Sequence, residues 1–103
     1  MKYCIVITTC GNREQAERLA KSILEENIAA CVQLSDITSF YHWDGTIAND
    51  KEVKLLIKTR ADLYEKLEKH ITKNHEYDIP EIIMLPIEKG SAAYLNWISE
   101  NTK

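Results

Sequence analysis

The chain has few of the residues that mark unusual architectures. Its 103 residues include three glycines and two prolines, which excludes a collagen-like repeat and argues against extensive disorder. Three cysteines cannot all pair within one chain, so we expect reduced thiols and a cytoplasmic protein. No stretch approaches the roughly 18 apolar residues of a membrane span. A net charge of −3 also argues against nucleic acid as a partner.

Common catalytic and metal-binding motifs are missing as well. The sequence has no C-x-x-C or H-E-x-x-H spacing, so a structural zinc site or a zinc protease is not expected. It also has no G-x-S-x-G, and its serines and histidines are scattered without a nucleophile context. We therefore expect a single domain over residues 1–103 that is not an enzyme and needs no cofactor to fold.

Hydrophobic periodicity alternates between the strand and helix patterns. Residues 2–9 are rich in β-branched side chains and predict a strand. A helix should follow between Asn12, a suitable N-cap, and Asn27, a suitable left-handed stop. Its apolar stripe consists of Ala16, Leu19, Ala20, Ile23 and Leu24.

The second half of the chain repeats this order. Residues 28–43 favour a strand, Asp44-Gly45 is a strong hairpin signal, and alternation around residues 53–57 predicts the returning strand. Residues 59–74 have helical spacing, and the apolar run 82–85 between two prolines predicts a short edge strand before a last helix capped by Ser91. The order β-α-β-β-α-β plus a helix predicts an α+β, ferredoxin-like sandwich.

The strand over residues 28–43 is too long for a compact monomer. Its sixteen residues would span ~50 Å if straight, whereas a domain of this size is only ~30–35 Å across. Either a bulge at Ser35-Asp36 bends the strand, or the hairpin overhangs its own domain. Because the run 82–85 is apolar on both faces, we expect hairpins to add strands to neighbouring subunits of a symmetric oligomer.

A series of motifs runs through nearly the whole chain: LEENIAACV at 24–32, SFYHWDG at 39–45, HEY at 75–77, IPEII at 79–83, LPI at 85–87 and YLNWI at 94–98. Their order resembles the CutA family of divalent-cation tolerance proteins. The resemblance implies a ferredoxin-like protomer and a homotrimer assembled in the manner of PII signalling proteins.

The same resemblance directs attention to metal ligands. Copper binding in the family is attributed to a cysteine that ends the first strand and to a His-His pair, positions that hold Thr8 and Asn74-His75 here. Of these, His75 carries over, with a local hydrogen-bonding role near a helix end as the alternative. Cys31, which could also be a small buried side chain, and Cys10, beside a helix N-terminus, are further candidates.

A second set of polar and aromatic residues could line a cleft between subunits. Its charged members can equally form solvated or inter-subunit ion pairs, and its aromatic members can anchor an interface. As a cleft, the set would hold a small anion or a metal complex. The set consists of Glu52, Lys58, Glu81, Tyr41, Trp43 and Tyr77.

Together these features predict a cytoplasmic homotrimer of the divalent-cation tolerance type that binds copper or a related divalent ion. The alternative is a PII-like binding module that holds a small ligand between subunits and passes a signal to a protein partner. Neither nucleic acid nor a membrane is expected as a partner.

Overall fold

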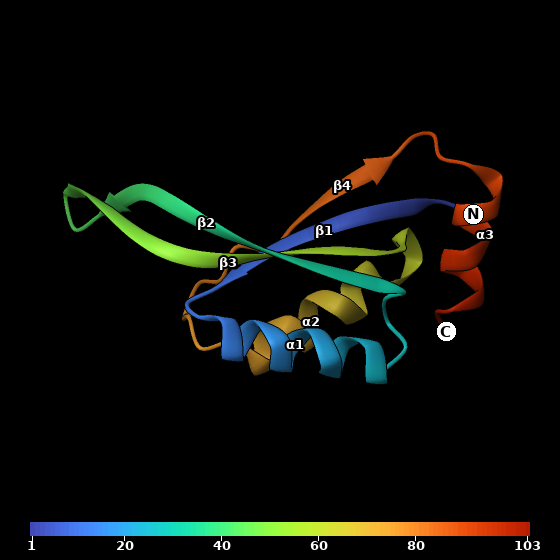
Figure 1. Cartoon of the computed structure of the whole chain (residues 1–103), viewed down its shortest axis with the longest axis horizontal. Coiled ribbons are helices and arrows are strands. Elements are labelled where there is room, and N and C mark those ends of the chain that lie inside the picture. The colour runs from blue at the N-terminus through green and yellow to red at the C-terminus, as the bar shows by residue number, and fades with distance from the viewer.

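The computed structural model describes all 103 residues as one four-stranded antiparallel sheet with three helices (Figure 1). The strand order in the sheet is β2-β3-β1-β4, which confirms the expected α+β, ferredoxin-like arrangement. The elements are β1 (Tyr3–Cys10), α1 (Arg13–Glu25), β2 (Cys31–Trp43), β3 (Thr46–Arg60), a 3-10 turn (Ala61–Leu63), α2 (Tyr64–Asn74), β4 (Ile83–Ile87) and α3 (Ala92–Glu100).

Alternation along β1 divides the sheet into a covered and an open face. Cys4, Val6 and Thr8 point toward α1 and α2 and are fully buried, while Ile5 and Ile7 are only half-buried on the opposite face. Figure 1 shows both of these helices on one side of the sheet. The covered face therefore holds the hydrophobic core. On the open face only α3 lies at one end, where Ser99 contacts Tyr3 and Tyr94 lies near Lys58.

The predicted helix caps are present. The Asn12 side chain accepts a hydrogen bond from the backbone N–H of Gln15 at 2.9 Å, and Asn27 ends α1 with a φ of 60°. Ser91 caps α3 by accepting from the N–H of Tyr94 at 3.2 Å. Burial of one stripe on α1 and of Leu67 on α2 then fixes both helices against the sheet.

Two predicted boundaries are wrong: the strand predicted from residue 28 begins at Cys31, and the helix predicted from residue 59 begins later. The helical spacing was expected to begin at Thr59, but this residue still belongs to β3 and pairs with Cys4. Its hydroxyl donates to the carbonyl of Ile28 at 2.8 Å, a tertiary bond that holds the β-branched residue in the strand. The chain turns only at Ala61–Leu63, and α2 begins at Tyr64.

The long hairpin projects beyond the rest of the molecule (Figure 1). Of the two alternatives for this length, the overhang is present and the bulge at Ser35-Asp36 is not, because β2 and β3 pair in unbroken register from Cys31–Lys58 to Trp43–Thr46. Asp44 and Gly45 both have positive φ, as a two-residue turn of type I′ requires. β1 accompanies the hairpin only as far as Val53, so the remainder overhangs the core.

The uncovered parts of the sheet carry large apolar side chains. β4 is the edge strand, as expected, and Ile83, Met84 and Leu85 on it are each more than 40% exposed. Near the tip of the hairpin, Phe40 is 72% exposed and Trp43 is 68% exposed. Monomeric proteins seldom leave such residues together in water. No helix here combines the length and the apolar character needed to cross a bilayer.

Two fully buried threonines provide a test of the core. The hydroxyl of Thr8 has no hydrogen-bond partner, whereas that of Thr59 donates to the Ile28 carbonyl. We expect Thr8→Val to raise the free energy of unfolding by about 1 kcal/mol, because it removes an unpaired buried polar group. The matched change Thr59→Val should lower it by about 1–3 kcal/mol, because a carbonyl loses its donor. Urea unfolding at one protein concentration measures both, and equal signs would contradict this account.

Candidate functional site

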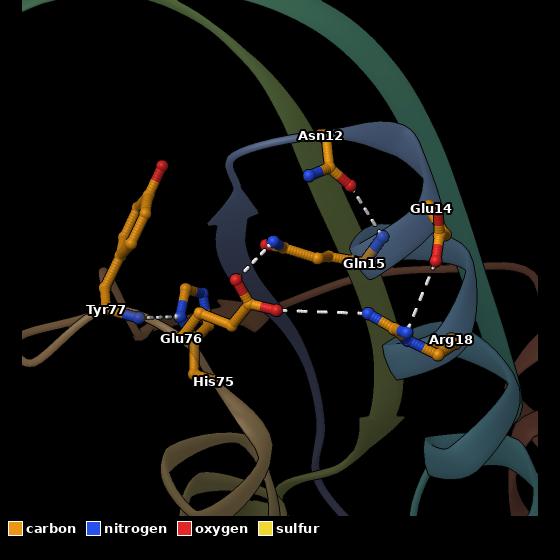
Figure 2. Close-up of polar contacts among 7 residues, drawn as sticks. All are labelled: Asn12, Glu14, Gln15, Arg18, His75, Glu76 and Tyr77. Atoms are coloured by element: carbon orange, nitrogen blue, oxygen red, sulfur yellow. Dashed lines mark hydrogen bonds and ion pairs between the residues drawn. The ribbon is translucent and has the colours of Figure 1, made fainter.

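The turn that follows α2 lies against the end of β1 (Figure 2). His75 is the C-terminal cap of α2, and its Nε2 lies 2.6 Å from the carbonyl oxygen of Thr9. Its Nδ1 accepts a hydrogen bond from the backbone N–H of Tyr77 at 3.0 Å. A carbonyl can only accept and a backbone N–H can only donate, so Nε2 carries the proton and Nδ1 is bare. His75 is therefore neutral in this arrangement.

Glu76 connects the same turn to α1. Its carboxylate accepts a hydrogen bond from the side-chain amide of Gln15 and lies 3.9 Å from the Arg18 guanidinium, which also pairs with Glu14 at 3.4 Å. Figure 2 shows these side chains facing one another across the gap between the turn and the helix. The ion pairs are exposed, so each contributes little to stability. The hydrogen bond from the Gln15 side-chain amide to Glu76 connects the turn directly to α1.

Tyr77 connects the turn to the hairpin. Its hydroxyl donates to the carboxylate of Glu52 on β3 at 2.9 Å, and its ring centroid lies 4.9 Å from that of His75. A Cβ at Gly11 would lie 3.2 Å from the Tyr77 hydroxyl oxygen, so the missing side chain leaves room for the ring. Burial and the bond to Glu52 raise the pKa of Tyr77 to about 12. The phenol thus stays protonated and donates at neutral pH.

Cys10 lies beneath this turn. It is 3% exposed, and burial together with the charges of Glu52 and Glu76 raises the pKa of its thiol to about 11. A small cavity of about 250 Å³ has both Cys10 and His75 in its lining. Metals bind the thiolate form, so a protein-bound cation would have to displace the proton from this sulfur.

The structure does not bring the three candidate metal ligands together. Cys31 pairs with Lys58 near the beginning of β1, whereas Cys10 pairs with Val53 at its end, on the side of His75. The chain contains no group of three or more His, Cys, Asp or Glu side chains placed to hold one metal ion. Any site with the usual number of protein ligands would need side chains from more than one chain or a rearrangement of this one.

The six candidate cleft residues also separate into different regions. Only Tyr77 and Glu52 contact each other. Tyr41 bonds to Asp50 on the hairpin, and the Lys58 ammonium lies 5.5 Å from the ring centroid of Tyr94. Trp43 is at the hairpin tip, and Glu81 is exposed in the loop before β4.

A second cavity occupies the base of the hairpin. It measures about 510 Å³ and lies where the strand pair leaves the core; its lining is Gly11, Asn12, Arg13, Asp36, Ile37, Thr38, Lys51, Glu52 and Val53. Across it, Arg13 forms an ion pair with Asp36 at 2.7 Å. Sequence reasoning missed Arg13, Asp36 and Lys51, because no spacing rule relates a helix start to the middle of a distant hairpin.

The sheet order and the projecting hairpin define an α+β protein of ferredoxin-like topology. The model of the CutA1 divalent ion tolerance protein family matches residues 4–101. This chain belongs to that family, as its motifs indicated.

Individual relatives agree with this assignment. Protein CutA, chloroplastic, of Arabidopsis thaliana is 47% identical over 96% of this chain, and the match covers 55% of that protein, so this chain spans about half its length. The divalent-cation tolerance protein CutA of Pyrococcus horikoshii is 42% identical over 96% of this chain and 97% of its own. The crystal structure of CutA1 from Oryza sativa superimposes with a TM-score of 0.97 at 43% identity, covering 100% of this chain and 95% of that one.

The two buried thiols predict how stability depends on pH. Burial raises the pKa of both Cys4 and Cys10 from 9.0 to about 11, so unfolding releases protons between these values. The stabilisation is complete below pH 9 and is lost as the pH rises toward 11. We expect the free energy of unfolding to fall over this range, and to fall less in the Cys4→Ala/Cys10→Ala variant, as measured by urea unfolding. Parallel pH profiles would contradict the assignment.

Proposed function

We propose that this chain acts as a single-domain subunit of a cytoplasmic homotrimer that binds divalent cations such as Cu(II) and catalyses no reaction. Membership of the divalent ion tolerance family supports the class of ligand. The three cysteines are all free, which fits a reducing compartment.

The uncovered parts of the sheet are the observation that supports a trimer. β2 and β3 continue past β1 as a two-stranded ribbon, and an isolated ribbon of this kind is only marginally stable in water. Exposed Phe40, Trp43 and Ile47 lie near its tip, while the edge strand β4 is apolar and unpaired on its outer side. Docking the hairpin of one subunit on the sheet of the next would cover both surfaces.

One chain does not place three or more metal-ligating side chains together. A cation site formed between such subunits could take its ligands from more than one chain. His75 offers a neutral imidazole, the form that binds Cu(II), through the nitrogen that faces away from Thr9. Cys10 borders the same cavity as His75, and Cys31 is half-exposed on the open face, where a neighbouring chain would approach.

Native mass spectrometry of the purified protein tests the assembly. We expect a mass of three chains, the number that the resemblance to the CutA family implies, and a closed ring would cover the hairpin and β4 of every subunit. The double change Phe40→Ser/Trp43→Ser should shift the mass toward one chain, whereas the matched change Glu65→Ser/Lys69→Ser on the exposed side of α2 should not. A wild-type mass of one chain at micromolar concentration would exclude the proposed trimer.

Calorimetric titration with Cu(II) tests the ligands. His75→Ala should weaken binding by about tenfold or more, since even the loss of a group that only supports a ligand costs that much. Cys31→Ser and Cys10→Ser should also weaken binding, because each removes a proposed sulfur ligand. The control is His70→Gln, since His70 instead bonds to Ser22 at 2.8 Å between the two helices. Unchanged binding in all three test variants would remove these residues as ligands.

A PII-like module that holds a small ligand is the second candidate, and the cavity at the hairpin base favours it. Its volume of about 510 Å³ lies within the range of small-molecule sites, and both cationic and anionic side chains line it. In the same native spectra, an added mass that survives treatment with a chelator would favour this function over cation binding.

A further inference from the structure

The lining of the cavity at the base of the hairpin differs between the two faces of the strand pair. Alternate residues of a strand point to the same side, so Lys51 lies on the side of Val53, which packs in the core, and Glu52 lies on the other. Asp36 pairs with Val53 and Thr38 pairs with Lys51, so these two also lie on the core side. The side of the hairpin that faces α1 therefore carries one lysine and one carboxylate.

Arg13, the first residue of α1, adds a second positive charge to this side. Figure 1 shows α1 beginning at the end of the sheet from which the hairpin projects. The Arg13 guanidinium donates to Asp36 at 2.7 Å through a single nitrogen, Nη2. Together with Lys51, the cavity lining on this side carries two positive charges and one negative charge.

The charged groups of the lining that still lack partners are donors. Asp36 already accepts from Arg13. Glu52 already accepts from the Tyr77 hydroxyl at 2.9 Å. A guanidinium has five N–H donors, of which Arg13 uses one here, and no carboxylate lies within ion-pair distance of Lys51. Only two of the nine lining residues are apolar, so a complementary ligand is polar, negatively charged and rich in acceptors.

We propose that this cavity binds a small phosphate monoester, with its phosphate group between Arg13 and Lys51. A phosphate dianion matches two cations in one group, and the planar fork of a guanidinium bonds to two phosphate oxygens at once. The volume of about 510 Å³ leaves room for the organic part of the ligand. This inference rests on the second candidate function, the module that holds a small ligand, and names the class of that ligand.

Asp36 competes with the phosphate for Arg13. Its side chain is 80% exposed, so water can hydrate the carboxylate when the guanidinium turns to a ligand. An exposed ion pair of this kind contributes little to stability, whereas bonds between a guanidinium and a phosphate are charge-assisted and can be bidentate. Asp36 therefore lowers the affinity for the ligand without preventing binding.

Calorimetric titration of the assembled protein with glycerol 3-phosphate at constant ionic strength tests the site. Lys51→Met and Arg13→Gln should each weaken binding about tenfold or more, because each removes a hydrogen bond to a charged group. Lys51 is exposed and Arg13 is half-exposed, so neither change should unfold the protein. Lys66→Met on the exposed side of α2 removes the same charge and should leave the affinity unchanged. Wild-type affinity in both cavity variants would overturn the proposal.

Asp36→Asn tests the competition. It frees Arg13 and should tighten binding of glycerol 3-phosphate about twofold to fivefold, the range of one exposed ion pair. The matched change Asp62→Asn removes a carboxylate that pairs with Arg60 at 3.1 Å, and it should leave the affinity unchanged. Equal tightening in the two variants would mean that net charge alone attracts the ligand, which would overturn the site.

The outcomes separate this ligand class from the function on which it rests. Succinate, a dianion without phosphate, should bind at least about tenfold more weakly than glycerol 3-phosphate. If succinate binds as tightly, or if glycerol 3-phosphate fails to bind while the native spectra show an added mass that survives a chelator, the phosphate ligand is wrong and the small-ligand module stands. If neither compound binds and no such mass is present, both proposals are wrong.

Discussion

The structure depends on a mismatch in strand length. β1 has eight residues, whereas β2 and β3 have 13 and 15, so the sheet can be fully packed only where β1 is present. Up to Val53 the strands alternate between the core and the open face, and α1 and α2 cover one side. Beyond that point no third strand pairs with the hairpin, and side-chain bonds such as those of Arg13 to Asp36 and of Tyr77 to Glu52 reach only its base. Its apolar tip is therefore a surface that needs a partner.

The polar side chains of the candidate site consequently lie around the end of β1. The turn after α2 folds against Thr9, Glu76 reaches α1, and Tyr77 reaches Glu52 at the start of the unsupported hairpin. One short turn thus contacts three elements. Both cavities border this junction, one beneath His75 and the other at the base of the hairpin. The turn therefore links α1, the end of β1 and the base of the hairpin.

Much of the fold could be predicted because its signals are local. The Asn12 cap, the left-handed Asn27 and the Asp44-Gly45 turn each act within a few residues, and all three are present. The error in where the second helix begins has a tertiary cause, because Thr59 stays in a strand through its bond to Ile28. Whether the hairpin bends or overhangs was left open by the sequence and is decided by the unbroken pairing of β2 and β3. The site was harder to predict, because it joins residues more than 60 positions apart, such as Gln15 and Glu76.

The amino-acid sequence by itself determined the order of elements, the hairpin, the family and the chemically active residue types. Only the tertiary structure decided what those residues can do. A histidine beside a helix end is a plausible ligand in any sequence, but whether its lone pair is free depends on which donors the fold brings to it. Here the N–H of Tyr77 occupies Nδ1, and burial keeps Cys10 protonated. Hydrogen-bond partners and burial arise from packing between distant segments, which no local pattern encodes.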